Sequence, residues 1–319
     1  MRFASKAARL IAGGMMFATL ASAQAAYPEK PVRVVVPFAA GGPADLSARL
    51  IAQKLSEQWK QPVVVDNRGG AGGNIGTALV GQALPDGYTL LLTTSVFISN
   101  PSLYKNAGYD PFKEFAPIIL AGVSATVVSR HPSYTAVNSM QDILQQSKIA
   151  PISFASPGIG TAGHLSGELF RNITKANIQA VPYKGAGPAM TALLGGEVRL
   201  GFTAVPPVVA LARGGKLVPI AVTSIKRLDV LPNVPTVAES YPGFEVDNMY
   251  GLLAPKATPE AIVARLNAEV NRQLPEIRTR FAELGSEIVG GTPKQFAEFL
   301  REDQSKWAKV IKASSVRAN

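Results

Sequence analysis

The chain has 319 residues, of which 47% are hydrophobic and 17% charged, and it contains no cysteine. This composition is typical of a globular protein of two ordinary domains, and it excludes disulfides, thiolate metal sites and cysteine nucleophiles. The formal net charge of +10 comes from lysines and arginines scattered singly, without interleaved aromatic residues, which argues against nucleic-acid binding. We expect the excess positive charge to attract anionic ligands.

The N-terminal segment has the pattern of a secretory signal peptide. A basic stretch with Arg2, Lys6 and Arg9 precedes the apolar run 10–20, and small-x-small cleavage sites follow that run. The apolar run is shorter than the roughly 20 residues that cross a bilayer, and no cysteine follows it as a point of lipid attachment. We therefore predict that residues 1–25 are a signal peptide and that the mature chain is a soluble periplasmic protein.

Short β-rich runs alternate with helical patterns in the first part of the mature chain. The predicted strands cover residues 32–38, 62–65 and 88–94, and the predicted helices cover residues 46–59 and 74–84. Repeated β-turn-α units with almost continuously apolar strands predict a parallel sheet that helices cover on both faces.

The same pattern begins again near residue 152. The predicted strands cover residues 152–156, 178–183, 198–204 and 217–224, and the predicted helices cover residues 164–173 and 190–194, with a short one after Pro206-Pro207. Beyond this second run the sequence predicts a strand at 249–254, a helix that Thr258 caps and that runs to Leu274, and a final helix beginning at Thr292.

These two runs of β-turn-α units predict an α/β protein with two lobes of parallel or mixed sheet. We assign residues 26–124 and 246–319 to the first lobe, because the last helices need a sheet to cover, and residues 125–245 to the second lobe. This division makes the chain cross between the lobes twice. Two crossings act as a hinge, so we expect a ligand cleft between the lobes.

Four glycine-rich turns lie between the carboxyl end of a predicted strand and the amino end of a helix, at residues 39–45, 67–74, 156–164 and 183–188. In open α/β sheets ligands bind at that edge, and the unpaired N–H groups of helix amino ends hold anions. Many α/β proteins have glycine in such turns, so one turn alone indicates little. Their recurrence in both lobes favours an anion-binding cleft.

One of these turns, Gly158–Gly163, also matches the dinucleotide pattern G-x-G-x-x-G. A dinucleotide site needs an acidic residue at the end of the next strand to bind the ribose. That strand ends at Tyr183 without an acidic residue, and the sequence has no phosphate-binding loop of the G-x-x-x-x-G-K-[ST] type. We therefore predict no nucleotide and no other cofactor.

Catalytic groups are few, because the sequence has two histidines, His131 and His164. With two histidines and no cysteine, no zinc site is expected. An exported hydrolase or isomerase using Ser156 or Ser166 with His164 is the alternative to a binding protein, although Ser166 is not in a G-x-S-x-G motif. Asp45 begins a helix and is expected to cap it, and Glu168 is expected to be solvated.

Several segments in order along the mature chain carry the pattern of one family. They are 27–31, 37–45, 66–76, 85–90, 109–111, 158–161, 164–165, 183–185, 231–236, 258–259 and the last helix with Trp307. On these segments the sequence resembles the substrate-binding proteins of tripartite tricarboxylate transporters, the Bug family. The resemblance implies a periplasmic-binding-protein fold of type II and a receptor, not an enzyme, that delivers an organic acid to a membrane permease.

The resemblance also implies a set of ligand-binding residues. In the second lobe, backbone N–H groups and hydroxyls grip one ligand carboxylate, with His164 near and three residues closing the rim. In this sequence those residues are Ser156, Gly160, Thr161 and His164, with Tyr183, Lys184 and Gly185 at the rim. The first-lobe residues that cover the other side are Phe38, Ala39, Ala40, Gly41, Gly42, Asp45, Asn67, Thr94 and Ser95.

One departure from the family pattern bears on the ligand. Many members have an acidic residue after the phenylalanine that this chain has at position 202, whereas here Thr203 and Ala204 follow. An acidic residue there could receive a ligand ammonium group, so we expect a ligand without an amino group, such as a mono- or dicarboxylate or an aromatic acid. We expect a monomer without a metal. A module that reports its ligand to a signalling partner remains an alternative to delivery to a permease.

Overall fold

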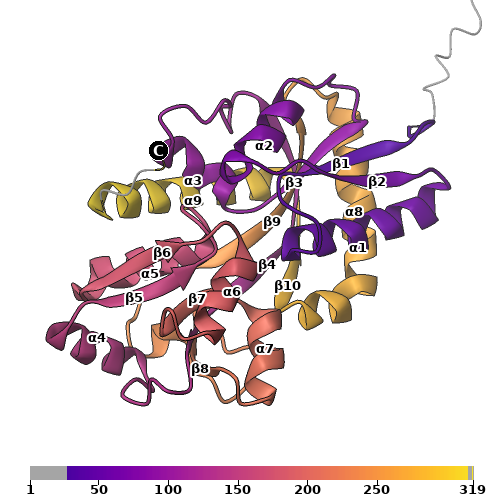
Figure 1. Cartoon of the computed structure of the whole chain (residues 1–319). Coiled ribbons are helices and arrows are strands. Elements are labelled where there is room, and N and C mark those ends of the chain that lie inside the picture. Colours follow the sequence, from indigo (N-terminus) through magenta and orange to yellow (C-terminus); the bar gives the residue numbers. More distant parts are fainter. Residues whose placement is uncertain (1–26, 315–317, 319) are drawn as a thin grey trace, which may run out of the picture.

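The computed structural model describes residues 27–314 and residue 318. The signal peptide predicted for residues 1–25 lies outside them. Elements of the first lobe are β1 (Val32–Val36), α1 (Pro43–Trp59), β2 (Val63–Asn67), α2 (Asn74–Gly81), β3 (Thr89–Thr93) and α3 (Val96–Leu103). From β1 to β3 they alternate as the sequence predicts, whereas α3 was not predicted, and helices cover the sheet (Figure 1).

The long strand β4 (Phe115–Arg130) leads into the second lobe. The elements of that lobe are α4 (Met140–Ile149), β5 (Ile152–Ser156), α5 (Ala162–Thr174), β6 (Ile178–Pro182), α6 (Ala186–Leu194), β7 (Leu200–Ala204), α7 (Val205–Arg213) and β8 (Val218–Val222). The chain then returns through β9 (Asp247–Pro255), α8 (Glu260–Glu283), β10 (Ser286–Gly290) and α9 (Pro293–Ser314). Short 3-10 turns lie at Ala71–Gly73 and Val237–Glu239.

The strand order is β2-β1-β3-β9-β4-β7-β5-β6, with β8 and β10 also paired to β4. Strands β1, β2 and β3 run parallel, as do β5, β6 and β7, whereas β9 is antiparallel to both β3 and β4. Residues 115–125 of β4 pair with β9, and residues 126–130 pair with β7 and β8. One unbroken strand therefore belongs to the sheets of both lobes, and each sheet is mixed.

Thr223 joins the two places where the chain crosses between the lobes. Its hydroxyl accepts a hydrogen bond from Thr126 N at 2.8 Å and donates to Val246 O at 2.7 Å. Its own carbonyl oxygen accepts from Val246 N. The side chain is fully buried, so both crossings are held at a fixed distance by one residue.

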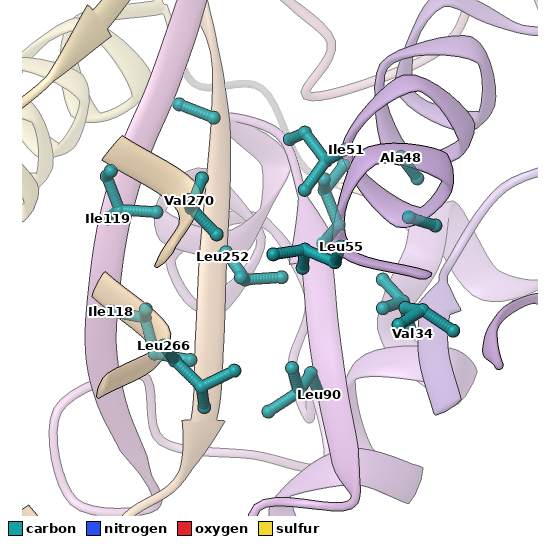
Figure 2. Close-up of a cluster of buried hydrophobic side chains, with 14 of the residues drawn as sticks. Val34, Ala48, Ile51, Leu55, Leu90, Ile118, Ile119, Leu252, Leu266 and Val270 are labelled. Carbon is teal, nitrogen blue, oxygen red and sulfur yellow. The ribbon is translucent and has the colours of Figure 1, made fainter. Parts of the chain in front are cut away.

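The core of the first lobe follows from the spacing of apolar residues in α1. Ala48, Ile51, Ala52 and Leu55 recur at helical intervals and are all buried. Figure 2 shows side chains of α1 and α8 gathered with those of the sheet strands, including Leu252 of β9. Burial of these side chains from both helices fixes α1 and α8 on the same face of the sheet.

Helix α9 contacts both lobes. Phe296 and Leu300 in its first half pack with first-lobe residues, whereas Trp307, Val310 and Ile311 in its second half pack with residues of β5 and α5. The helix lies beside α3 and α5 (Figure 1). The predicted division of the chain places all of 246–319 in the first lobe. It did not anticipate that the second half of α9 packs against the second lobe. Within residues 27–314, no helix has the length and apolar character of a membrane span.

Candidate functional site

The two glycine-rich loops of the first lobe pack against each other. Asn67 Nδ2 donates to Phe38 O at 3.1 Å. A Cβ on Gly76 would lie 2.4 Å from Arg68 O, so only glycine allows this approach of the backbones. Phe38 is half-buried against the core, while Ala39, Ala40 and Gly41 are exposed at the tip of the loop and Gly42 is half-buried. These predicted residues therefore lie together at one edge of the sheet.

Asp45 holds the turn that precedes α1. Its Oδ2 accepts hydrogen bonds from Gly41 N at 2.8 Å and from Arg49 Nε at 3.0 Å. Burial acts to raise the pKa of Asp45, but the hydrogen bonds from Arg49 and Gly41 outweigh it, so the pKa lies below its usual value. The expectation that Asp45 caps the helix is wrong, because the N-terminus of α1 has no side-chain cap and the carboxylate instead bonds to the turn before it. Contact with a ligand stays a prediction.

Thr94 and Ser95 lie buried between β3 and α3. Ser95 Oγ donates to Asp247 O and accepts from Met249 N, so its hydroxyl is occupied by the start of β9. Thr94 O accepts from Phe97 N and begins the first turn of α3. The two residues therefore connect the first lobe to the returning chain.

The second-lobe loops converge because β5 is parallel to both β6 and β7, which brings the carboxyl ends of all three strands to one edge. Tyr183 N donates to Ser156 O at 3.0 Å, and Gly185 N donates to Pro157 O at 2.9 Å. A Cβ on Gly163 would lie 2.2 Å from Phe202 O, so the first turn of α5 rests directly on the end of β7.

Several polar groups of the loop before α5 form hydrogen bonds with other groups of the same loop. Gly160 N donates to His164 Nδ1 at 3.2 Å. Thr161 Oγ1 donates to Gly158 O at 2.7 Å and accepts from His164 N at 3.4 Å, which makes Thr161 the N-cap of α5. Three of the groups predicted to bind the ligand therefore already have partners within the loop.

His164 is neutral in this arrangement. Its Nδ1 accepts a hydrogen bond, so Nε2 carries the proton. Burial, with a smaller contribution from the positive charge of Arg171, lowers the pKa of His164 to about 4. The imidazole is thus an acceptor for backbone rather than a cationic partner for an anion.

Other polar groups at the ends of β5 and β7 and at the start of α5 have no partner. The N–H groups of Ala162 and Gly163, at the amino end of α5, meet no acceptor within the described part of the chain. Among the same residues, Ser156 Oγ and Thr203 Oγ1 are unpaired although both side chains are buried. A buried donor without an acceptor costs about 1–3 kcal/mol, so these groups are suited to a ligand that supplies oxygen acceptors.

The rim of the second lobe contains the remaining predicted residues. Tyr183 is half-buried and its hydroxyl donates to Glu197 Oε1 at 3.1 Å. Lys184 is exposed, and Gly185 begins α6 with a φ of 112°. Ala204 is half-buried and precedes α7.

Neither serine of the hydrolase alternative is bonded to His164. Ser166 Oγ donates to Ala162 O at 2.7 Å, and Ser156 Oγ is unpaired. The expectation that Glu168 is solvated is wrong, because it is buried and forms an ion pair with Arg171. In residues 27–314, no three histidine or acidic side chains gather as metal ligands would.

Sequence reasoning missed α3, which brings two polar residues to the second-lobe loop. Ser99 Oγ donates to Gly160 O at 3.1 Å, across the two lobes. Asn100 Nδ2 donates to Gly72 O at 3.0 Å and to Asn74 Oδ1 at 2.7 Å. The polar pair Ser99-Asn100 directly after the apolar run 96–98 is the one signal that could have marked this contact.

Two α/β lobes, joined by crossing strands and meeting at loops with unpaired donors, define a solute-binding receptor of the periplasmic-binding-protein type. The chain belongs to the tripartite tricarboxylate transporter family receptors, whose family model matches residues 47–316. Members of this family are periplasmic solute-binding receptors rather than enzymes.

Individual relatives agree with this assignment. The chain is 36% identical over 301 residues to protein BugT of Bordetella pertussis, which covers 91% of each protein. The structure of R. palustris Rpa4515 with adipate superposes with a TM-score of 0.85 at 35% identity, covering 91% of this chain and 99% of that one. MatC of Rhodopseudomonas palustris with bound malate gives a TM-score of 0.80 at 32% identity, covering 89% and 100%.

Proposed function

We propose that this protein captures a small carboxylic acid between its lobes and that one ligand carboxylate binds at the amino end of α5. The observation that carries the proposal is the unpaired N–H groups of Ala162 and Gly163 there, together with the unpaired buried hydroxyls of Ser156 and Thr203 at the ends of β5 and β7. Carboxylate oxygens accept from such neutral donors, and the positive end of the helix dipole adds to the attraction.

The chemistry of the site and the ligands of the relatives favour the same class. Adipate and malate, bound to two relatives, are dicarboxylates without an amino group. Thr203 offers a hydroxyl and no negative charge, so an ammonium group would be buried there without a counter-ion, which is costly. We therefore propose a mono- or dicarboxylate, or an aromatic acid, that lacks an amino group.

The exposed loop of the first lobe, from Ala39 to Gly42, covers the other end of the ligand in this proposal, and Lys184 and Tyr183 border the entrance. We further propose that residues 1–25 direct export and that the loaded receptor delivers its ligand to a membrane permease of the tripartite tricarboxylate type. Pull-down from solubilised membranes with and without ligand tests delivery, and recovery of a signalling protein in place of a permease would favour the sensing alternative.

Titration calorimetry of residues 26–319 tests the binding proposal. Adipate, malate and succinate are the probes, with adipamide and glutamate as neutral and amino-containing controls. We expect at least one acid to bind at about micromolar strength, near −8 kcal/mol, and both controls to bind far more weakly. Tight binding of adipamide, or of glutamate over every simple acid, would contradict the proposal.

Variants at the unpaired donors locate the site. Ser156→Ala is compared with Ser133→Ala, which removes an exposed hydroxyl in a distant loop. Loss of a hydrogen bond to a charged group should weaken binding by about 1.5–3 kcal/mol in the first variant and leave the second unchanged. Equal affinity in both variants would remove Ser156 from the site.

A further inference from the structure

We propose that Ser99 and His164 form a latch between the lobes by holding the two sides of Gly160, and that this latch slows ligand release. His164 accepts from Gly160 N within the second lobe, while Ser99 of the first lobe donates to Gly160 O. Both are positioning residues in this scheme, because they act through Gly160. The inference rests on the proposed binding of a carboxylate at the amino end of α5.

Contact between α3 and Gly160 is direct. A Cβ on Gly160 would lie 2.7 Å from Leu103 Cδ1 and 3.0 Å from Asn100 Oδ1, so a side chain at this position would displace these two side chains of α3. Gly160 also has a φ of 80°, a conformation that L residues rarely adopt. Size and backbone conformation therefore both require glycine where the two lobes touch.

Asn100 extends the latch to the first-lobe loop. Its Nδ2 bonds to Gly72 O and Asn74 Oδ1, and the side chains of Ser99 and Asn100 are fully buried. A continuous set of hydrogen bonds therefore runs from the loop before α2, through α3, to the loop before α5. The loops predicted to contact the ligand from opposite sides are linked by α3.

The place of Gly160 in the chain connects the latch to the ligand. Gly160 precedes by two and three residues the N–H groups of Ala162 and Gly163, which we propose bind the carboxylate. Fixing both sides of the Gly160 residue orients this first turn. Separation of the lobes must break the bond from Ser99 and expose Leu103, so the latch favours the closed form and holds the ligand in it.

The proposed latch requires His164 to be neutral. Nδ1 can accept from Gly160 only while the imidazole is neutral, and burial keeps it neutral down to a pH of about 4. The charged groups around it include Arg171, whose positive charge also disfavours protonation, and the Arg171–Glu168 ion pair on the same helix. The latch should therefore stay intact throughout the neutral pH range.

Ligand release tests the latch, with dissociation rates of bound adipate or malate measured by stopped flow. Ser99→Ala should raise koff about tenfold and change kon little. The matched control is Ser147→Ala, because Ser147 is also a buried serine whose hydroxyl donates to a backbone carbonyl, Leu144 O at 2.8 Å, but lies in α4. It should leave koff unchanged.

Two substitutions of His164 separate positioning from packing. His164→Asn keeps an acceptor oxygen close to the place of Nδ1, whereas His164→Leu keeps bulk without an acceptor. We expect Leu to raise koff as Ser99→Ala does and Asn to restore most of the slow release. If koff is equal in the Asn and Leu variants, the hydrogen bond that His164 accepts from Gly160 does not control ligand release.

A second measurement keeps the latch testable if no probe acid binds. The natural chain has no cysteine, so Val64→Cys and Ile149→Cys, at exposed sites in different lobes, allow selective spin labelling. Ser99→Ala should shift the distance distribution of ligand-free protein to longer values, and Ser147→Ala should not. Unchanged distances and unchanged koff in Ser99→Ala overturn the latch. Failure of every acid to bind, with altered distances, instead overturns the proposed ligand.

Discussion

Ser95, immediately before α3, donates its hydroxyl hydrogen to the carbonyl oxygen of Asp247, 3.2 Å away and 152 residues later in the chain. The same hydroxyl accepts from Met249 N, so one buried side chain sets the start of β9. Asp247 stands where the chain returns to the first lobe and pairs with Ala125 of β4. The backbone of Asp247 is therefore fixed at the crossing between the lobes, and this is where its carboxyl group lies.

This position predicts a pH-dependent loss of stability. Burial, with the negative charges of Glu245, Glu287 and Asp303, raises the pKa of Asp247 from 3.8 to about 7, and Lys306 opposes this only in part. Between these pH values the unfolded chain holds fewer protons than the folded one, so stability falls as pH rises. In the wild type, the free energy of unfolding should fall by something on the order of 2 kcal/mol between pH 4 and 7.5, measured by urea unfolding. Asp247→Asn should remove this fall. Identical pH profiles for variant and wild type would contradict this.

His164 should make the free energy of unfolding depend on pH in the opposite direction. Its pKa is about 4 in the folded protein against 6.5 ordinarily, so the unfolded chain binds more protons between these values. The stability linked to His164 is complete above pH 6.5 and is lost as pH falls through 4. His164→Asn should flatten this part of the profile in the same unfolding experiment. A steeper acid loss in the variant would show that another group is responsible.

Thr203→Val should change stability and affinity in opposite directions. The hydroxyl of Thr203 is buried without a partner, and valine has nearly the same shape, so the ligand-free protein should gain about 1 kcal/mol. The proposed carboxylate should meanwhile bind more weakly, by about 1.5–3 kcal/mol. Thermal unfolding without ligand and calorimetry with ligand measure the two effects. Thr191→Val, at an exposed position of α6, is the control and should change neither.

Leu55→Ala tests the core beneath α1. Leu55 is completely buried among residues of α8 and the sheet, so the substitution should cost about 2–5 kcal/mol of unfolding free energy. Leu46→Ala in the same helix, where the side chain is 37% exposed, should cost far less. Chemical denaturation of both variants provides the comparison, and similar losses would show that the core is packed differently.

The sequence predicted those elements whose pattern is local. Apolar spacing located α1, and glycine after apolar runs located the turns that follow β1 and β5. No element was expected for residues 96–149, where the structure has α3, β4 and α4. Strand β4 is buried on both faces and contains Pro117 and Gly122, so it shows neither alternation nor an uninterrupted apolar run. Its partner β9 lies more than a hundred residues away.

The sequence predicted which loops form the candidate site, but not which of their donor atoms remain unpaired. Strand ends and glycines placed Ser156 and Thr203 at one edge of the second sheet. Which donors remain unpaired depends on the conformation of the loop itself, where Thr161 caps α5 and His164 accepts from Gly160. That conformation depends in turn on packing against α3, a contact between distant parts of the chain that residue spacing does not encode.

Helix α9 limits how the lobes can move. Phe296 is anchored in one core and Trp307, eleven positions further along, in the other, so about 16 Å of continuous helix separates the two anchors. A rigid rod with both ends embedded keeps that separation constant whether ligand is present or absent. Because α3 and the loop before α5 meet beside this rod, a separation of the lobes that breaks the Ser99–Gly160 bond must also turn α9 against at least one of the two cores.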